Sequence, residues 1–147
     1  MGTITDLGMK VGTEPVITAS SCVLVFNSLG HLLLQRQNES LEWGLIEGVM
    51  ETGESLEETA ARELIKETGL SAKTYKLITI LSGNVTNEEY PQKEVYKVRA
   101  VFEANEVEGE LYNHGNEGME CKFFCLKTHL PHLNSSTEYI LKKTGYL

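Results

Sequence analysis

The sequence has 147 residues, 41% of them hydrophobic and 23% charged, a composition that predicts one folded domain over residues 1–147 with its own apolar core. It excludes a disordered chain, and no apolar run is long enough to cross a bilayer, so no membrane association is expected. The formal net charge of −8 argues against nucleic-acid binding, but a small anionic substrate is compatible with it where metal ions or local cations receive that substrate.

Residues 1–14 are expected to be a lead-in without a defined element, and two strands are expected to follow it. Residues 17–27 and 31–36 are rich in apolar and β-branched side chains, and the turn signal Ser28-Leu29-Gly30 lies between them. This pattern predicts a β-hairpin. Residues 43–51 are expected to be extended and to lead into a turn at 51–54.

The segment from Ser55 to Gly69 carries the best helix signal. Ser55 with Glu58 three residues later is a capping box, and Gly69 stands where a C-cap glycine ends a helix. One apolar stripe of this helix is expected to pack on a sheet: Leu56, Ala60, Ala61 and Leu64. Glu63 and Glu67, four residues apart, are expected along one edge of that stripe.

Three more strands are expected in the second half, at residues 75–81, 94–104 and 120–126. Polar loops at 82–93 and 105–118 separate them. Ser135 or Ser136 is expected to cap a short last helix that Gly145 ends. The order of strands, helix, strands and helix predicts an α+β fold or an α/β/α sandwich, with a mixed sheet packed against helices.

The cysteines indicate the compartment. Cys22, Cys121 and Cys125 form no CxxC pair and have no zinc-ligand spacing, which favours free thiols in a reducing environment. The first fourteen residues lack the apolar segment of a signal peptide. A cytoplasmic location is therefore expected.

Residues 48–70 contain the candidate catalytic and metal-binding residues. Asp6 is the only aspartate among 21 acidic residues, so carboxylate chemistry falls to glutamates. Glu54 at the helix entry and Glu63 and Glu67 on the helix are expected to converge, and carboxylates so close are usually relieved by a divalent cation. Oxygen ligands favour Mg²⁺ or Mn²⁺ over zinc. The alternative is a solvated helix face whose cations form surface ion pairs.

The spacing of this segment resembles the signature of the Nudix hydrolases, G-x5-E-x7-R-E-U-x-E-E-x-G-U, in which U is a bulky aliphatic residue. The matching positions are Gly48, Glu54, Arg62, Glu63, Leu64, Glu67, Gly69 and Leu70. The resemblance is compatible with residues 17–145, but only residues 43–70 match the family specifically.

The resemblance implies the Nudix fold, a mixed sheet between helices, and Mg²⁺- or Mn²⁺-dependent hydrolysis of a nucleoside diphosphate linked to another group X. Glu63 and Glu67 would be metal ligands, one of them also a base for water. Arg62 would orient a catalytic glutamate, and Glu54 would be a further or outer ligand. The main-chain carbonyl of Glu47 would also face the metal.

The substrate side of the site is less defined by the resemblance. Either Glu117 or Glu120 would be the glutamate that many family members supply from a late loop. Arg36 at the end of the second strand and Lys66 on the helix are expected to reach substrate phosphate. The alternative for Arg36 is a solvated strand end, and for Lys66 a surface residue that pairs with Glu63. Trp43 is expected to be a packing anchor. The oligomeric state, a homodimer included, is left open.

Two departures from the family pattern define the alternative function. Lys66 replaces the first glutamate of the E-E pair, and Leu45-Ile46-Glu47-Gly48 replaces the usual Leu-Pro-Gly-Gly. The first hypothesis is a pyrophosphohydrolase acting on a small nucleotide-type substrate. The alternative is a catalytically weakened Nudix-fold module that binds nucleotides or regulates.

Overall fold

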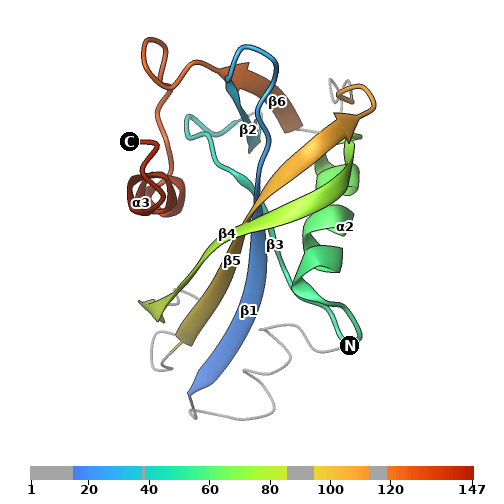
Figure 1. Ribbon diagram of the computed structural model, residues 1–147. Helices are drawn as coiled ribbons and strands as arrows, with labels where there is room; N and C mark the ends of the chain where they lie inside the picture. Colours follow the sequence, from blue (N-terminus) through green and yellow to red (C-terminus); the bar gives the residue numbers. More distant parts are fainter. Residues whose placement is uncertain (1–14, 38, 86–94, 113–118) are drawn as a thin grey trace.

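The structure is a computed structural model that describes residues 15–37, 39–85, 95–112 and 119–147 (Figure 1). Its strands are β1 (Val16–Leu24), β2 (Leu32–Gln37), β3 (Ile46–Val49), β4 (Ser71–Val85), β5 (Val95–Glu108) and β6 (Met119–Phe124). Its helices are α2 (Leu56–Thr68) and α3 (Ser135–Lys143). The lead-in predicted for residues 1–14 and the candidate Glu117 lie outside the described residues.

The main sheet has four strands in the order β3-β1-β5-β4. Strand β1 pairs with β5 in parallel and with β3 in antiparallel orientation, and β4 pairs with β5 in antiparallel orientation. A second, two-stranded sheet pairs β2 with β6. The main sheet is therefore mixed, as predicted.

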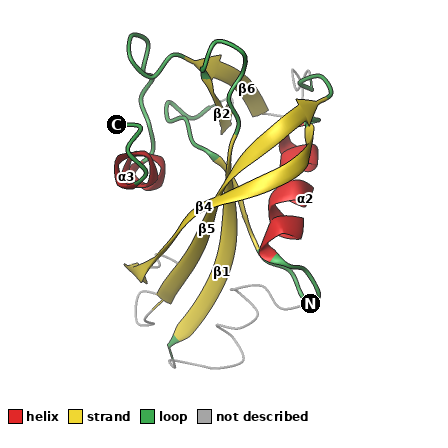
Figure 2. Cartoon of the chain, viewed as in Figure 1, coloured by secondary structure: helices red, strands yellow, loops and turns green. Residues whose placement is uncertain are grey.

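The two helices lie on opposite sides of the main sheet (Figures 1 and 2). On the α2 side, Leu64 packs with sheet residues such as Val23 and Phe102. On the α3 side, Ile140 packs with Cys22 among others. The predicted α+β sandwich is confirmed. No helix in the described part of the chain is long and apolar enough to span a membrane.

Helix α2 begins and ends where its sequence predicts. The Ser55 hydroxyl accepts a hydrogen bond from the Glu58 main-chain N–H at 3.1 Å, and the Glu58 carboxylate accepts one from the Ser55 N–H at 2.8 Å. Gly69 ends the helix in the left-handed conformation, at φ 83°. Most residues adopt this conformation only at a cost, which explains a glycine here.

The predicted hairpin of the first two segments forms only next to its turn. There Phe26 and Leu32 form an antiparallel bridge with two hydrogen bonds, from Leu33 N–H to the Val25 carbonyl and from Asn27 N–H to the His31 carbonyl. Along the rest of its length β2 pairs with β6 and not with β1. The turn at Gly30 forms as expected, with φ 77°. The leucines at 32–34 are fully buried. Because neighbouring side chains of a strand point to opposite faces, apolar residues pack on both faces of β2, which favours a position away from the edge of the main sheet.

Several predicted boundaries are also wrong. Strands β4 and β5 extend into both predicted polar loops, because they pair with each other along most of their length and this satisfies the backbone of polar residues. Helix α3 is capped by Asn134, whose side chain accepts from the Thr137 N–H at 2.8 Å, and not by Ser135 or Ser136.

Candidate metal and catalytic site

Glu54 closes the loop that connects β3 to α2. Its Oε1 accepts hydrogen bonds from the Glu51 main-chain N–H and from the Thr59 hydroxyl, both at 2.9 Å. The Glu54 carboxylate therefore ties the loop to the first turn of the helix.

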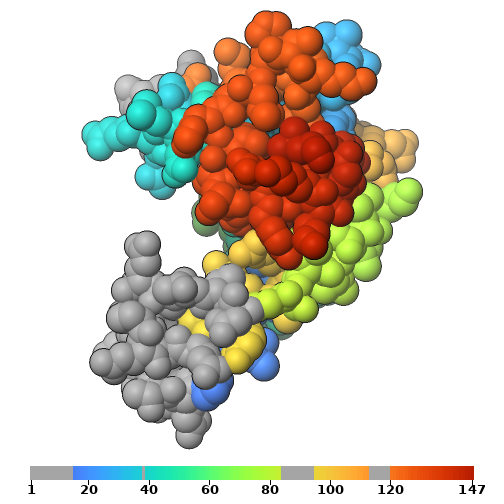
Figure 3. All heavy atoms as spheres, turned by 90° about the vertical axis from the view of Figure 1, so that its left-hand side faces the viewer, coloured from blue at the N-terminus to red at the C-terminus, as the bar shows by residue number. Residues whose placement is uncertain are grey.

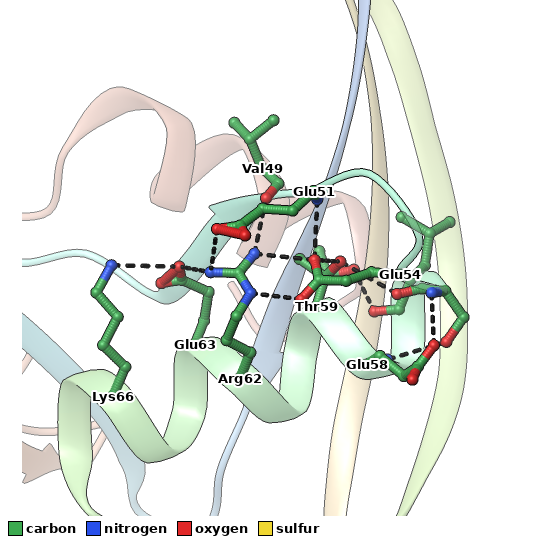
Figure 4. A network of polar contacts seen from close by, with 11 residues as sticks. Val49, Glu51, Glu54, Glu58, Thr59, Arg62, Glu63 and Lys66 are labelled. Carbon is green, nitrogen blue, oxygen red and sulfur yellow. Dashed lines mark hydrogen bonds and ion pairs between the residues drawn. The ribbon is translucent and has the colours of Figure 1, made fainter. Parts of the chain in front are cut away.

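Arg62 is the centre of the polar network that follows (Figure 4). Its Nε and Nη2 donate to Glu54, while Nη1 donates to Oε1 of Glu63 at 2.9 Å. Nη2 also donates to the main-chain carbonyl of Val49 at 2.9 Å, and Glu51 Oε1 lies 3.4 Å from Nη1. One guanidinium thus holds three carboxylates and the end of β3 in a fixed arrangement, because its planar fork presents several donors at once.

Glu63 lies inside the packed face of α2, with only 5% of its surface exposed, and not at the predicted edge. Gly48 makes this possible. A Cβ atom on Gly48 would lie 2.4 Å from both Cγ and Cδ of Glu63, a distance that real atoms do not adopt. The missing side chain of Gly48 is therefore the space that the Glu63 side chain fills against β3.

Lys66 lies between the two helix glutamates proposed as metal ligands. Its Nζ is 3.7 Å from Oε1 of Glu63 and 3.9 Å from Oε1 of Glu67, and its side chain is 63% exposed. The two carboxylates therefore converge on one position that favours positive charge. The alternative to a metal site was a solvated helix face whose cations form surface ion pairs. In this structure Lys66 forms such ion pairs with both glutamates.

The donor set fits a hard divalent cation in part. Glu63 and Glu67 supply carboxylate oxygens, the ligand type that Mg²⁺ and Mn²⁺ prefer. Within the described ranges, however, no three His, Cys, Asp or Glu side chains form a group that could hold a metal ion. The predicted convergence of Glu54 with Glu63 and Glu67 is therefore wrong. The Glu54 carboxylate accepts hydrogen bonds from Arg62 and from the Glu51 N–H instead. Further oxygens would have to come from the backbone, from water, from substrate or from residues outside the described ranges.

Strand β6 passes beside α2, since the thiol of Cys121, the residue after Glu120, donates to the main-chain carbonyl of Glu67 at 3.5 Å. Arg36 and Glu120, paired across β2 and β6, form a salt bridge of 2.9 Å with each other. The Arg36 guanidinium also lies 5.0 Å from the centroid of the Trp43 ring. Trp43 is buried and packs edge-on against Phe124, so its predicted role as a packing anchor is confirmed.

Glu47 points away from α2. Ile46 is buried on the α2 side, and in a strand the next side chain points to the opposite face. The exposed Glu47 side chain therefore lies on the α3 side, where it interacts electrostatically with Arg99 and Lys97 of β5.

Sequence reasoning missed a cavity of about 480 Å³ between α3 and the main sheet. Lys97 and Arg99 line it from β5, and Ser135, Ser136 and Tyr139 line it from α3. The signal available in the sequence was two cations spaced two residues apart on a predicted strand, which places both on one face. What they face depends on where the last helix packs.

The folded structure strongly favours the ionised form of Glu54. The hydrogen bond from Arg62, followed by that from the Glu51 N–H, lowers the pKa of Glu54 from 4.5 to about 2. A carboxyl with a lowered folded-state pKa stabilises the fold above its ordinary pKa, and this contribution is lost as the pH falls through the lowered value.

We therefore expect the melting temperature in metal-free buffer to fall as the pH is lowered from about 4.5 to about 2, and to fall less in Glu54→Gln. Thermal unfolding followed by circular dichroism over this range measures the difference. Parallel curves for the two proteins would show that Glu54 does not contribute to the acid response.

Comparison with known proteins identifies the family. The model of the NUDIX domain matches residues 16–143 of this chain. The chain belongs to the Nudix family. Its signature segment is thus the β3–α2 unit described above, with Arg62 at its centre.

Similar proteins of this family include an ADP-ribose pyrophosphatase of Methanocaldococcus jannaschii, 34% identical over 113 residues. That match covers 76% of this chain and 63% of the relative, so the chain spans less than two thirds of that protein's length. Among solved structures, a mutator MutT protein from Bacillus halodurans has a TM-score of 0.68 at 25% identity, covering 85% of this chain and 80% of that one.

The fold is also shared with a MutT Nudix hydrolase from Burkholderia pseudomallei. The TM-score is 0.68 at 21% identity, with 86% of this chain and 96% of that chain covered. At this identity the likeness concerns the fold alone.

Proposed function

We propose that this Nudix chain is a metal-dependent pyrophosphohydrolase that cleaves the diphosphate of a nucleoside diphosphate linked to another group. The observation that carries the proposal is the convergence of the Glu63 and Glu67 carboxylates on one cation position, with Glu63 held by Arg62. The similarity to an ADP-ribose pyrophosphatase supports this substrate class.

Glu63 and Glu67 would hold Mg²⁺ or Mn²⁺, with the Glu47 main-chain carbonyl as a further donor. A divalent ion in such a site supplies charge stabilisation to phosphoryl oxygens and lowers the pKa of bound water. Glu117, outside the described residues, stays a candidate for a late-loop ligand or base.

The protein side of the mechanism is orientation and proton transfer. Arg62 fixes the Glu63 carboxylate by a charge-assisted hydrogen bond, while Gly48 lets that carboxylate lie directly against β3. Glu67, whose side chain is 22% exposed, is the carboxylate of the pair that solvent reaches more readily. We assign to Glu67 the acceptance of a proton from the attacking water.

The test is incubation with Mg²⁺ and a panel of diphosphate compounds: ADP-ribose, nucleotide sugars, dinucleoside polyphosphates and oxidised nucleoside triphosphates. Alkaline phosphatase, added afterwards, releases phosphate from the monoester products of cleavage, while an intact internal diphosphate ester resists it. Reactions without the chain correct for terminal phosphates that the phosphatase removes directly. Phosphate release no greater than that of Glu67→Gln would contradict the proposal.

The position of Lys66 supports the second candidate, a weakened module that binds nucleotides. Its ammonium occupies the vicinity in which a cation would be held and so competes with metal. Lys66→Glu removes this charge and adds a carboxylate. We expect Mg²⁺ affinity to rise about thirtyfold, since each of these two charge changes contributes on the order of 1 kcal/mol when exposed.

Calorimetric titration with Mg²⁺ measures the change. Lys142→Glu is the matched control, because Lys142 is similarly exposed at 61% and pairs with Glu138 on its own helix. If hydrolysis rises together with metal affinity in Lys66→Glu, the natural chain is a weakened enzyme. Unchanged affinity would show that Lys66 is only a surface residue.

A further inference from the structure

Strand β4 forms one edge of the main sheet and is much longer than β3, the strand at the other edge. It has 15 residues, whereas β3 has 4. In an antiparallel pair, alternate residues direct their backbone N–H and C=O groups to the partner strand, and the residues between them direct theirs away from it. Within the described residues only β5 pairs with β4, so the outward groups of β4 face no other strand. In Figure 3, β4 is the yellow-green segment beside the dark red α3.

The charges on β4 do not protect this edge. Natural sheets prevent edge strands from pairing by short length, by prolines or by charged side chains. Strand β4 contains no proline and no acidic residue, and its charged side chains are Lys73 and Lys76. Each lysine is matched by a glutamate of β5: Nζ of Lys73 lies 3.8 Å from Oε1 of Glu108, and Lys76 is paired with Glu103. Two copies of this acidic chain can therefore approach each other here with little repulsion.

Two large apolar side chains of β4 are half exposed, Leu77 at 49% and Ile80 at 53%. Both lie on the α2 face, because residues directly opposite each other in paired strands share a face. Leu77 is opposite Phe102 and Ile80 is opposite Ala100, and both of these partners belong to the core on the α2 side. Apolar side chains next to an open strand edge favour pairing with a further strand.

The faces of β4 are symmetric about its centre, because the pairing with β5 skips Ile78. Ile78 packs against the core on the α3 side, and Thr79 is opposite Val101 of the same core, so both lie on the α3 face. Between 75 and 82, the α2 face carries Tyr75, Leu77, Ile80 and Ser82, and the α3 face carries Lys76, Ile78, Thr79 and Leu81. This order of faces reads the same in both directions.

The symmetry selects one kind of partner strand. A bulge such as that at Ile78 disturbs pairing with a regular strand, because two residues then oppose one. A second β4 in antiparallel orientation has its extra residue at the same place. When Leu77 is opposite Ile80 of the second copy, Ile78 is opposite Thr79, and every side chain keeps its face. The bulge therefore disfavours other strands but matches a copy of itself.

We propose that the outer edge of β4 pairs with β4 of a second copy of this chain, in antiparallel orientation about a two-fold axis. A two-fold dimer is the commonest homo-oligomer, and each of its contacts occurs twice. The two Lys76 side chains are then about 17 Å apart, five residues at about 3.4 Å each, which exceeds the screening length of about 8 Å. The inference does not rest on the proposed function, since Glu63 lies against Gly48 of β3 at the other edge of the sheet.

Sedimentation velocity in metal-free buffer, from about 1 μM to about 1 mM protein, tests the proposal. We expect the mass of two chains at the upper end of this range and of one chain at the lower end. Ile80→Lys is expected to raise the dissociation constant of the dimer about tenfold or more, because the lost apolar contact occurs twice. Leu41→Lys is the control, since Leu41 is 80% exposed and lies outside the strands. A natural protein that is monomeric throughout, or a dimer that Ile80→Lys does not weaken, would overturn the inference.

A double variant tests the register. Leu77→Glu alone is expected to weaken the dimer, whereas Leu77→Glu/Ile80→Lys places opposite charges across the two-fold axis and is expected to restore it. Melting temperatures confirm that each variant is folded. A double variant that dimerises no better than either single variant would overturn the proposed pairing of Leu77 with Ile80.

Amide hydrogen exchange distinguishes a second copy from other occupants of the edge. The outward N–H groups of β4 are expected to exchange slowly at high protein concentration and rapidly at low concentration, because only the dimer pairs them. Slow exchange at every concentration would show that the same chain covers its own edge, which would overturn the inference.

Discussion

Glu63→Gln is expected to lower kcat for a nucleoside diphosphate derivative by about a hundredfold while the chain stays folded. Glutamine has nearly the same shape as glutamate, and its amide oxygen can still accept the hydrogen bond from Arg62. What is lost is the negative charge that the two neighbouring cations now contact. That charge is the property a divalent ion requires, so activity should suffer more than folding.

The measurement is kcat at saturating Mg²⁺ together with the melting temperature by circular dichroism. Glu57→Gln makes the same chemical change at an exposed position on the same helix and is expected to retain activity. If the activity lost by Glu63→Gln is matched by loss of folded protein, Glu63 has a structural role only.

Gly48→Ala is expected to lower kcat/KM to a similar extent, through a single added methyl group. The new Cβ would lie 2.4 Å from carbon atoms of Glu63, so the carboxylate must move. A displacement of about 1 Å in the groups that position the reacting atoms can cost about a hundredfold in rate. Overpacking of a buried position also lowers the free energy of unfolding, by about 1–3 kcal/mol.

Two further variants separate these effects. Gly30→Ala introduces strain at a left-handed turn position, φ 77°, with no neighbour near its Cβ, and is expected to lose about 1 kcal/mol of stability but no activity. The double variant Gly48→Ala/Glu63→Gln should be barely slower than Glu63→Gln, because both changes act through one carboxylate. Fully additive losses would show that Gly48 acts independently of Glu63.

The weakness of the natural site, if Lys66→Glu confirms it, has a structural explanation. A lysine that contacts both glutamates stabilises the helix in the absence of metal but must be displaced for the metal to bind. The same residue would then set the metal concentration at which the enzyme becomes active.

The sequence by itself determined the parts of this protein that depend on short-range interactions. The start and end of α2 follow from Ser55, Glu58 and Gly69, because capping joins residues three or four apart. The signature spacing likewise placed Glu63 and Glu67 on one helix, four residues apart, and so predicted that they would share a cation.

The tertiary structure alone decided which elements meet. Three features join residues far apart in the chain: the pairing of β2 with β6, the burial of Glu63 against Gly48, and the cavity that Arg99 and Ser136 both line. A hydrophobic pattern shows that a strand will be buried, but several partners satisfy it equally well. Only packing of the whole chain selects among them, because contacts between distant residues stabilise the fold only when both sides are already in place.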